Sequence, residues 1–295
     1  MNAGERGFLL LTGSMGDPAR KPMTVAQFRN LATRVQQMEK PDSTRLLKAD
    51  DLVALGYDKS MAQHIIDLLS AEDALDRYLR RGLQQHCIPI TRVSSGYPQA
   101  VRQRLGLDAP GCLWAKGDIT LLDTQTISLV GSRDLAEENR NFAEAVGIET
   151  ARQGFTLVSG NARGADRTAQ EACLAAGGRV ICVVADELQS QPLRENVLYL
   201  SEDSFDLPFT GQRALSRNRV IHTLGYITLV AGCTLGRGGT WDGTTNNLRR
   251  NLSPVFCFAD GSEAMMELER LGTTLITQQQ LRDLTALQPN VIKFI

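Results

Sequence analysis

The spacing of apolar residues divides the chain into two parts with different local structure. After residue 125, short apolar runs alternate with stretches of helical period, and the runs occupy 127–130, 155–158, 180–185, 197–200, 226–231 and 255–258. Strands that alternate with helices predict an α/β domain with a mostly parallel sheet and helices on both faces. In such sheets, ligands bind at the carboxyl ends of the strands.

Before residue 86 the pattern is helical. Apolar residues recur at helical spacing near 25–38, 49–55, 59–70 and 72–85. We therefore predict a small helical domain at residues 23–85, of the sterile-alpha-motif or helix-hairpin-helix type. Residues 1–22 show no periodicity and are predicted to be a loose leader. Residues 86–125, interrupted by Gly and Pro, are predicted to connect this domain to the α/β domain at 126–295.

Composition limits the kinds of site that this fold can carry. The net charge is −1, from 32 basic and 33 acidic residues, so any basic site must be local. The six cysteines include no CxxC pair and there are only three histidines, so we expect neither a metal site nor a cofactor. The apolar run at Phe8–Leu11 is too short to cross a membrane. These features predict a cytoplasmic protein without a membrane partner.

Two glycine loops follow predicted strands and are candidate phosphate sites. The first is Gly131-Ser132-Arg133, and the second is Ser159-Gly160-Asn161-Ala162-Arg163-Gly164. A glycine loop that leads from a strand to a helix N-terminus turns backbone N–H groups toward an anion, and arginine adds a forked donor. The first loop could equally be an ordinary strand-to-helix turn at Gly131, with Arg133 exposed on the surface. Asp166 fits the first turn of the helix, where a carboxylate favours the helix dipole.

Two further segments complete the candidate site. Arg213 and Arg217 lie four residues apart on a predicted helix, followed by Asn218 and Arg219. These arginines could equally form a solvated helix face. After the next strand, the loop 236–244 contains four glycines, and we include Gly238, Gly239 and Thr240 in the site. Trp241 in this loop suits either stacking on a base or anchoring the loop in the core.

Motifs for catalysis are missing from these loops. The second glycine loop lacks the G-x-G-x-x-G spacing of dinucleotide folds and the lysine of nucleotide hydrolases. The sequence presents no Ser/His/Asp or Cys/His set and no pair of carboxylates beside the glycines. It therefore favours a binding protein over an enzyme, and we assign no catalytic residue.

In order, these segments resemble motifs of the DNA-processing protein A (DprA/Smf) family. The matching pieces are SLVGSR (128–133), SGNARGADRTAQEACLAAGG (159–178), YLSE (199–202), SRNRVIHTLG (216–225) and GRGGTWDGT (236–244). The resemblance implies an extended Rossmann-like fold that binds single-stranded DNA without hydrolysis, as a homodimer. It implies phosphate contacts by Arg133, by the loop 159–164 and by Arg217, Asn218 and Arg219. Gly211 to Leu215 contain no aromatic residue, so base stacking is not expected there, while Arg213 supplies positive charge.

The resemblance leaves the pathway and the partner open. Family members load a RecA-type recombinase onto DNA, whereas divergent relatives serve in phage-defence modules beside a toxin. Two other functions suit the fold. One is a sensor that binds a small nucleotide signal. The other is a nucleotide phosphoribohydrolase, although the segment after Gly238-Gly239-Thr240 lacks that enzyme's glutamate.

Overall fold

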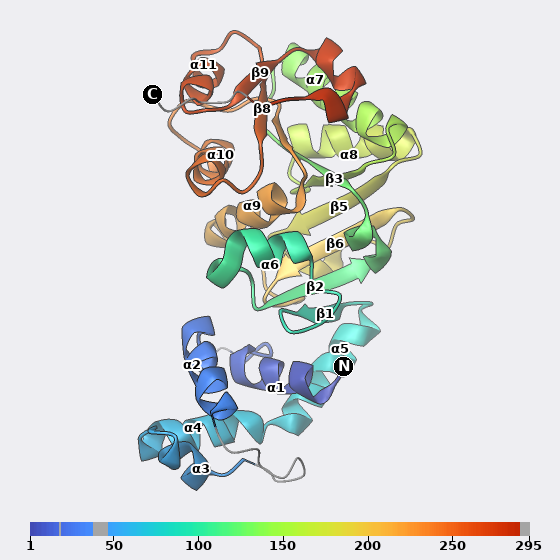
Figure 1. Ribbon diagram of the computed structural model, residues 1–295. Coiled ribbons are helices and arrows are strands. Elements are labelled where there is room, and N and C mark those ends of the chain that lie inside the picture. Colours follow the sequence, from blue (N-terminus) through green and yellow to red (C-terminus); the bar gives the residue numbers. More distant parts are fainter. Residues whose placement is uncertain (18, 38–46, 290–295) are drawn as a thin grey trace.

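The apolar runs become strands of one nine-stranded sheet in the computed structural model, which describes residues 1–17, 19–37 and 47–289 (Figure 1). The order across the sheet is β1-β2-β6-β5-β4-β3-β7-β8-β9. The strands are β1 (Ile88–Thr91), β2 (Cys112–Gly117), β3 (Thr126–Val130), β4 (Thr156–Ser159), β5 (Arg179–Val184), β6 (Val197–Glu202), β7 (Thr228–Val230), β8 (Val255–Phe258) and β9 (Thr274–Ile276). All neighbours from β6 to β9 are parallel, while β2 runs antiparallel to β1 and β6.

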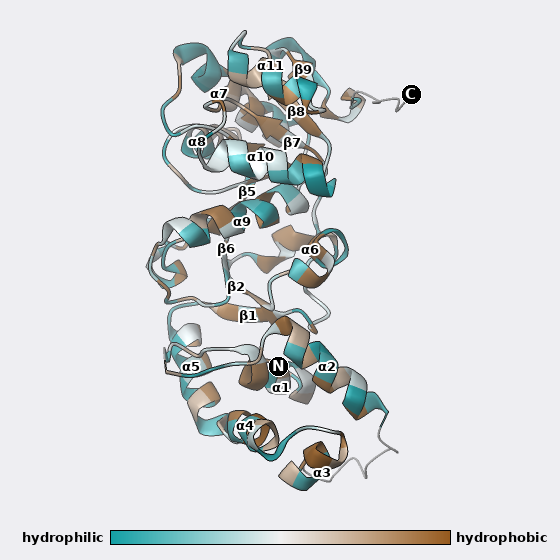
Figure 2. Cartoon of the chain, turned by 90° about the vertical axis from the view of Figure 1, so that its left-hand side faces the viewer, coloured by the Kyte–Doolittle hydropathy of each residue, from teal (hydrophilic) through white to brown (hydrophobic). Residues whose placement is uncertain are grey.

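Helices cover both faces of this sheet, as the sequence predicts. One face packs against α7 (Glu137–Arg152) and α8 (Ala165–Ala175), and the other against α6 (Gln99–Leu105), α9 (Gly211–Leu224), α10 (Gly239–Arg250) and α11 (Glu263–Arg270). Successive strand residues alternate between the two cores: Leu129 lies in the first and Val130 in the second. Polar residues lie on the outer surfaces of helices such as α7 (Figure 2). The predicted mostly parallel α/β fold is therefore confirmed.

The N-terminal helices are α1 (Ala3–Thr12), α2 (Val25–Gln36), α3 (Ala49–Ala54), α4 (Lys59–Leu69) and α5 (Glu72–Gln84). Helices α1 to α4 form a smaller core, whereas α5 packs in the first core of the sheet through Leu75 and Tyr78. Leu31, Leu52 and Ile65 are buried together in this core. Helices α2 to α5 lie close to their predicted positions; Met38, at the predicted end of the first, lies outside the described residues. The rest of 38–46, within the predicted helical domain, also lies outside the described residues. So do residues 290–295, at the end of the predicted α/β domain.

The prediction of a loose leader at residues 1–22 is wrong, because α1 is a capped and buried helix. The side chains of Asn2 and Glu5 each accept a hydrogen bond from the other residue's backbone N–H, at 2.9 and 2.8 Å, which makes a capping box. Phe8 to Leu11 are all buried, since α1 contacts α2, α4, α5 and β1. A helix enclosed on several sides has no single apolar face, and this removes the periodic signal.

The prediction that residues 86–125 form a separate connector is also wrong. This segment contains β1, α6 and β2, and β2 pairs with β6 over Leu113–Gly117. The α/β domain therefore includes strands that precede residue 126. These strands are short and lie at one edge of the sheet, so they lack the regular strand–helix alternation that marks the parallel part.

Candidate nucleic-acid interface

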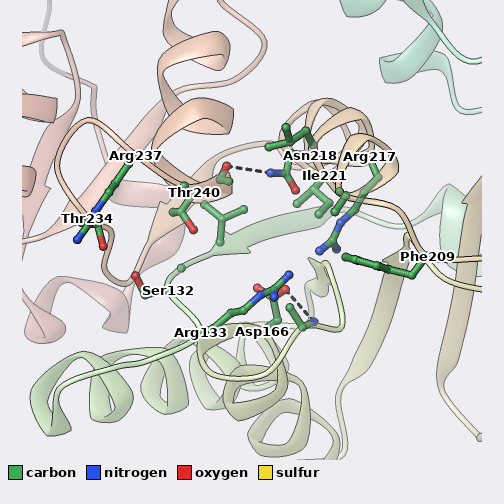
Figure 3. Close-up of a pocket in the computed structure, with 18 residues that line it drawn as sticks. Ser132, Arg133, Asp166, Phe209, Arg217, Asn218, Ile221, Thr234, Arg237 and Thr240 are labelled. Atoms are coloured by element: carbon green, nitrogen blue, oxygen red, sulfur yellow. Dashed lines mark hydrogen bonds between the residues drawn. The ribbon is translucent and has the colours of Figure 1, made fainter.

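A pocket of about 540 Å³ lies at the carboxyl ends of the central parallel strands (Figure 3). We call it the central pocket. Its walls come from the loop after β3, the start of α8, the N-terminal half of α9 and the segment that leads into α10. The lining residues are Val130, Gly131, Ser132, Arg133, Ala162, Asp166, Phe209, Gly211, Ala214, Leu215, Arg217, Asn218, Ile221, Thr234, Arg237, Gly238, Gly239 and Thr240.

Arg217 is a buried cation in the wall of this pocket. Its side chain belongs to a residue that is only 7% exposed, and Nη1 donates a hydrogen bond to Val183 O at 2.7 Å. Its Nε has no hydrogen-bond partner among the described residues. Burial lowers the pKa of Arg217, and the nearby Asp166 carboxylate opposes this shift. A buried guanidinium with an unused donor favours an anion beside it.

The glycine at position 160 makes room for this guanidinium. A Cβ atom built on Gly160 would lie 1.6 Å from Arg217 Nη1. Gly164 has φ +85°, and a Cβ there would lie 2.4 Å from the carbonyl oxygens of Ser132 and Arg133. These glycines therefore allow the loop after β4 to pack closely against α9 and against the loop after β3.

Asp166 contributes more to the pocket than a favourable helix dipole. It is 6% exposed and lines the central pocket, and its Oδ2 accepts a hydrogen bond from Ala162 N at 3.1 Å. Burial raises the pKa of Asp166, and the Arg217 charge opposes this. In Figure 3 the Asp166 carboxylate lies beside Arg133 in the middle of the site.

The loop 159–164 offers fewer free donors than its sequence suggests. The Ala162 N–H already donates to Asp166, and the Ala165 N–H donates to Ser132 O at 3.1 Å. The Ser159 hydroxyl is buried and accepts a hydrogen bond from Gln170 Nε2. Positive charge at this pocket therefore comes chiefly from arginine side chains. The loop allows these side chains to pack closely beside it.

Two exposed arginines face the central pocket from opposite sides. Arg133 follows β3, and Arg237 precedes α10. Neither guanidinium donates a hydrogen bond to any residue that the structure describes. In Figure 3, Arg237 lies on the side of Thr234, and Arg133 lies nearer to Arg217 and Phe209. Arg237 lies in the glycine-rich segment 236–244, of which only Gly238, Gly239 and Thr240 were predicted to belong to the site.

A second pocket of about 260 Å³ adjoins the first, and we call it the side pocket. It shares Arg133, Ala162, Phe209 and Arg217 with the central pocket, and its other lining residues are Gly160, Asn161, Arg163, Arg167, Ala185 and Asp186. Arg163 forms an ion pair with Asp134 at 2.9 Å, with side chains 73% and 88% exposed. Exposed pairs of this kind contribute little stability, so this pair does not prevent Arg163 from meeting another anion.

The structure does not bring every predicted residue to these pockets. Arg213 donates from Nη1 to the carbonyl oxygens of Ala185 and Leu207, at 2.7 and 2.8 Å, and Arg219 forms an ion pair with the buried Glu202 at 2.9 Å. Ser159 and Gly164 do not line either pocket. Placing Arg213 and Arg219 in the groove was wrong, because both guanidinium groups bind partners from distant segments of the chain.

An aromatic residue that the sequence analysis missed lies at the edge of both pockets. Phe209 is 55% exposed and lies in the loop between β6 and α9. The prediction that Gly211 to Leu215 offer no aromatic residue for base stacking concerns positions within the helix, whereas Phe209 precedes the helix by two residues. An aromatic between Pro208 and Thr210 just before a cationic helix was the available signal.

The glycine-rich segment 238–240 forms the start of α10 and not a long open loop. Gly238 is the N-cap with φ +91°, and the Gly239 carbonyl accepts a hydrogen bond from Asn218 Nδ2 at 2.9 Å. Trp241 packs against the core under α6, α9 and α11 and does not line either pocket. The structure thus favours the anchoring role for Trp241.

Within the described ranges, no group of three or more His, Cys, Asp or Glu side chains is placed to hold a metal ion. The same residues include no helix whose length and apolar character would let it cross a membrane.

Comparisons with known proteins match the part of the chain that forms this site. The family model for DNA recombination-mediator protein A matches residues 89–253. The DNA processing protein DprA of Bacillus subtilis is 35% identical over 124 residues, which cover 42% of this chain and 40% of that protein. Protein Smf of Escherichia coli is 28% identical over 142 residues, covering 44% of this chain and 38% of that protein. The matched segment thus spans about two fifths of each relative's length.

Solved structures of two such proteins share the fold. The crystal structure of DprA from Streptococcus pneumoniae aligns with a TM-score of 0.65 and 23% identity, over 88% of this chain and 96% of that one. DprA from Helicobacter pylori, described for its single-stranded DNA binding mode, aligns with a TM-score of 0.57 and 22% identity, over 66% of this chain and 94% of that one. The family model covers more than half of the chain and includes every loop of the two pockets, so the chain belongs to the DNA recombination-mediator protein A family.

Proposed function

We propose that this protein binds single-stranded DNA in the central and side pockets. The observation that carries the proposal is a set of three exposed arginines that line these pockets and have no side-chain partner among the described residues. Arg133, Arg167 and Arg237 donate no side-chain hydrogen bond to these residues, and the buried Arg217 adds positive charge to the wall that both pockets share. Guanidinium groups that the fold leaves unsatisfied suit the phosphates of a nucleic-acid backbone.

The pockets suit a strand with unpaired bases. They share Arg133, Arg217 and Phe209, so one strand passing from one pocket to the other would present successive phosphates to the arginines. Phe209 is the exposed aromatic side chain at this junction and offers a face for stacking. Bases in a duplex already stack on one another, so an aromatic platform favours single strands and little sequence preference. The DprA of Helicobacter pylori, which shares the fold, is described as binding single-stranded DNA.

The carboxylates near the pockets suit holding DNA better than cutting it. Asp166 is buried, bonded to a backbone amide and close to Arg217. Asp186 in the side pocket accepts a hydrogen bond from Gln191 Nε2 at 3.2 Å. We therefore propose a non-catalytic role. From the family to which the chain belongs, we further propose that it acts in DNA recombination as a homodimer that loads a RecA-type recombinase onto the strand.

Substitution of the two exposed arginines of the central pocket tests this proposal. Arg133→Ala and Arg237→Ala should each weaken binding of a labelled oligothymidine of about 20 nucleotides by roughly 10-fold, since each removes a phosphate contact. Fluorescence anisotropy measures the affinity. Arg249→Ala is the matched control, because it removes an exposed arginine of α10 that does not line either pocket. Wild-type affinity in both pocket variants would refute the assignment.

A sensor for a small nucleotide is the second candidate function. The central pocket, at about 540 Å³, lies within the range of small-ligand sites. Competition separates the two functions: adenosine and guanosine monophosphates should displace the oligonucleotide only at concentrations far above its own dissociation constant. Displacement at equal concentrations would favour the sensor.

A further inference from the structure

The loop that contains Phe209 is anchored by contacts with the N-terminal helix α5. This loop, residues 203–210, joins β6 to α9. The Tyr78 hydroxyl on α5 lies 2.5 Å from Ser204 Oγ and donates to Asp206 Oδ1 at 3.0 Å. Arg81, one turn later on α5, forms an ion pair with Asp206. Helix α5 and this loop are more than a hundred residues apart in the sequence, so these contacts tie the helical part of the chain to the loop.

Aromatic packing fixes the same junction. Phe205 is fully buried, and its ring lies 4.8 Å from Tyr78 and 4.7 Å from Trp114 of β2, between ring centroids. The Arg81 guanidinium lies 5.4 Å from the Phe205 ring centroid. Gly82 lets α5 approach this cluster, since a Cβ there would lie 2.8 Å from the Trp114 ring. Burial of a large aromatic side chain restricts the backbone on either side of it.

Arg213 holds the other end of the loop. Its Nη1 donates to the carbonyl oxygens of Leu207 and Pro208, at 2.8 and 3.0 Å, and its Nη2 donates to Ser201 Oγ at 2.8 Å. Residues 204 to 208 are therefore fixed from both sides. Phe209 follows directly and projects, 55% exposed, to the edge of both pockets.

We propose that Tyr78 and Arg81 are positioning residues for Phe209, so that the N-terminal helices set the affinity of the DNA pocket. This inference rests on the proposed function. Neither Tyr78 nor Arg81 lines the pockets, so their effect on DNA passes through the loop 203–210. A stacking side chain on a loosely held loop must be ordered when DNA binds, and this ordering reduces the affinity.

Three variants of α5 provide the first test, in the full chain with labelled oligothymidine. Arg81→Ala and Tyr78→Phe should each weaken binding by about 3- to 10-fold, because the loop loses an anchor. Tyr78→Phe removes only the hydroxyl and keeps the ring against Phe205, so the fold is retained. Arg80→Ala is the control: this exposed arginine also lies on α5, and its one side-chain hydrogen bond to a described residue goes to Asp76 O within its own helix. It should bind like the wild type.

A double-mutant cycle with Phe209 separates positioning from other causes. If Arg81 acts through Phe209, then Arg81→Ala should have no further effect on DNA affinity in a Phe209→Ala background. Arg81→Lys, which can still pair with Asp206, should recover most of the affinity. An equal loss in both backgrounds, or no loss from Arg81→Ala and Tyr78→Phe, would overturn the inference. If instead the proposed DNA site is wrong, Arg133→Ala would also leave binding unchanged, and this result distinguishes the two cases.

Discussion

At the scale of single residues, the site depends on one missing side chain. Gly160 directly follows β4 and contacts the guanidinium of Arg217 from α9, and there is no space for a Cβ between them. This contact lets a guanidinium remain buried at the carboxyl ends of the strands while its Nη1 bonds to Val183 O. The buried Asp166 carboxylate is near enough to oppose the effect of burial on the Arg217 pKa. Gly160, Asp166 and Arg217 thus form one unit.

Gly160→Ala should therefore impair both stability and binding. The new methyl group would displace the Arg217 guanidinium from its hydrogen bond to Val183 O, and loss of a buried hydrogen bond from a charged group lowers the free energy of unfolding by about 1–3 kcal/mol. Urea unfolding measures this loss, and anisotropy should show weaker DNA binding. Gly96→Ala is the control, since a Cβ at Gly96 meets nothing within 4 Å. An unchanged unfolding midpoint in Gly160→Ala would contradict the steric account.

The sequence predicted which arginines lie near the site better than it predicted which groups each of them contacts. Arg133 and Arg217 follow from their positions after a strand and on the adjoining helix, and both line the pockets. Arg213 has the same helical spacing as Arg217, yet its guanidinium binds carbonyl groups of two other segments. Such acceptors are set by tertiary packing and leave no local signal. Phe209 was missed for the opposite reason, because its exposure depends on how the loop before α9 is anchored.

At the scale of elements, α9 and α10 share a buried polar interface beside the pocket. His222 on α9 is fully buried, and its Nδ1 lies 3.0 Å from Asn247 Nδ2 on α10. Asn247 also bonds to Ser253, through both its amide nitrogen and its oxygen. His222 Nε2 has no partner among the described residues. Burial lowers the pKa of His222 to about 4.

This buried imidazole predicts a loss of stability in mild acid. The pKa of His222 in the folded chain lies below the ordinary histidine value of 6.5, so the unfolded chain binds a proton that the folded chain does not as the pH falls from 6.5 toward 4. The free energy of unfolding should fall by about 3 kcal/mol over this range from His222 alone. His222→Gln should show a correspondingly smaller loss in urea unfolding between these pH values, with His64→Gln on α4 as the control for removing a histidine. Parallel curves for wild type and His222→Gln would contradict this account.

The sequence predicted the elements that belong to the repeated strand–helix part of the chain. It did not predict those whose structure depends on contacts with distant segments. The parallel strands appear as short apolar runs because both of their faces are buried, and α7 to α9 show helical periods because each packs one face on the sheet. Helix α1 is buried on several sides, and β2 joins the sheet antiparallel at its edge, beyond the strand–helix alternation. The segment 238–240 contains glycines that resemble a loop, but Gly238 caps a helix that continues through Trp241. In each case the neighbouring element, and not the local pattern, determines the structure.

At the scale of the whole molecule, the strand order explains why the site lies where it does. The chain places β4, β5 and β6 on one side of β3, and β7, β8 and β9 on the other. The loops after β3, β4 and β7 therefore diverge around one point and leave a crevice between them. The N-terminal helices reach this crevice indirectly, through α5 and the loop 203–210. One junction between the two parts of the chain thus lies beside the site, at the loop 203–210.

We propose that arginines in this crevice bind the phosphates of single-stranded DNA. The most direct measurement is the affinity of the wild-type protein for oligothymidine at salt concentrations from about 50 to about 200 mM. Two adjoining pockets should hold at least two phosphates, so log K should fall linearly with log salt, with a slope of about −1.4 or steeper for a single strand. Affinity that does not change with salt, or no binding at the lowest salt concentration, would contradict the claim.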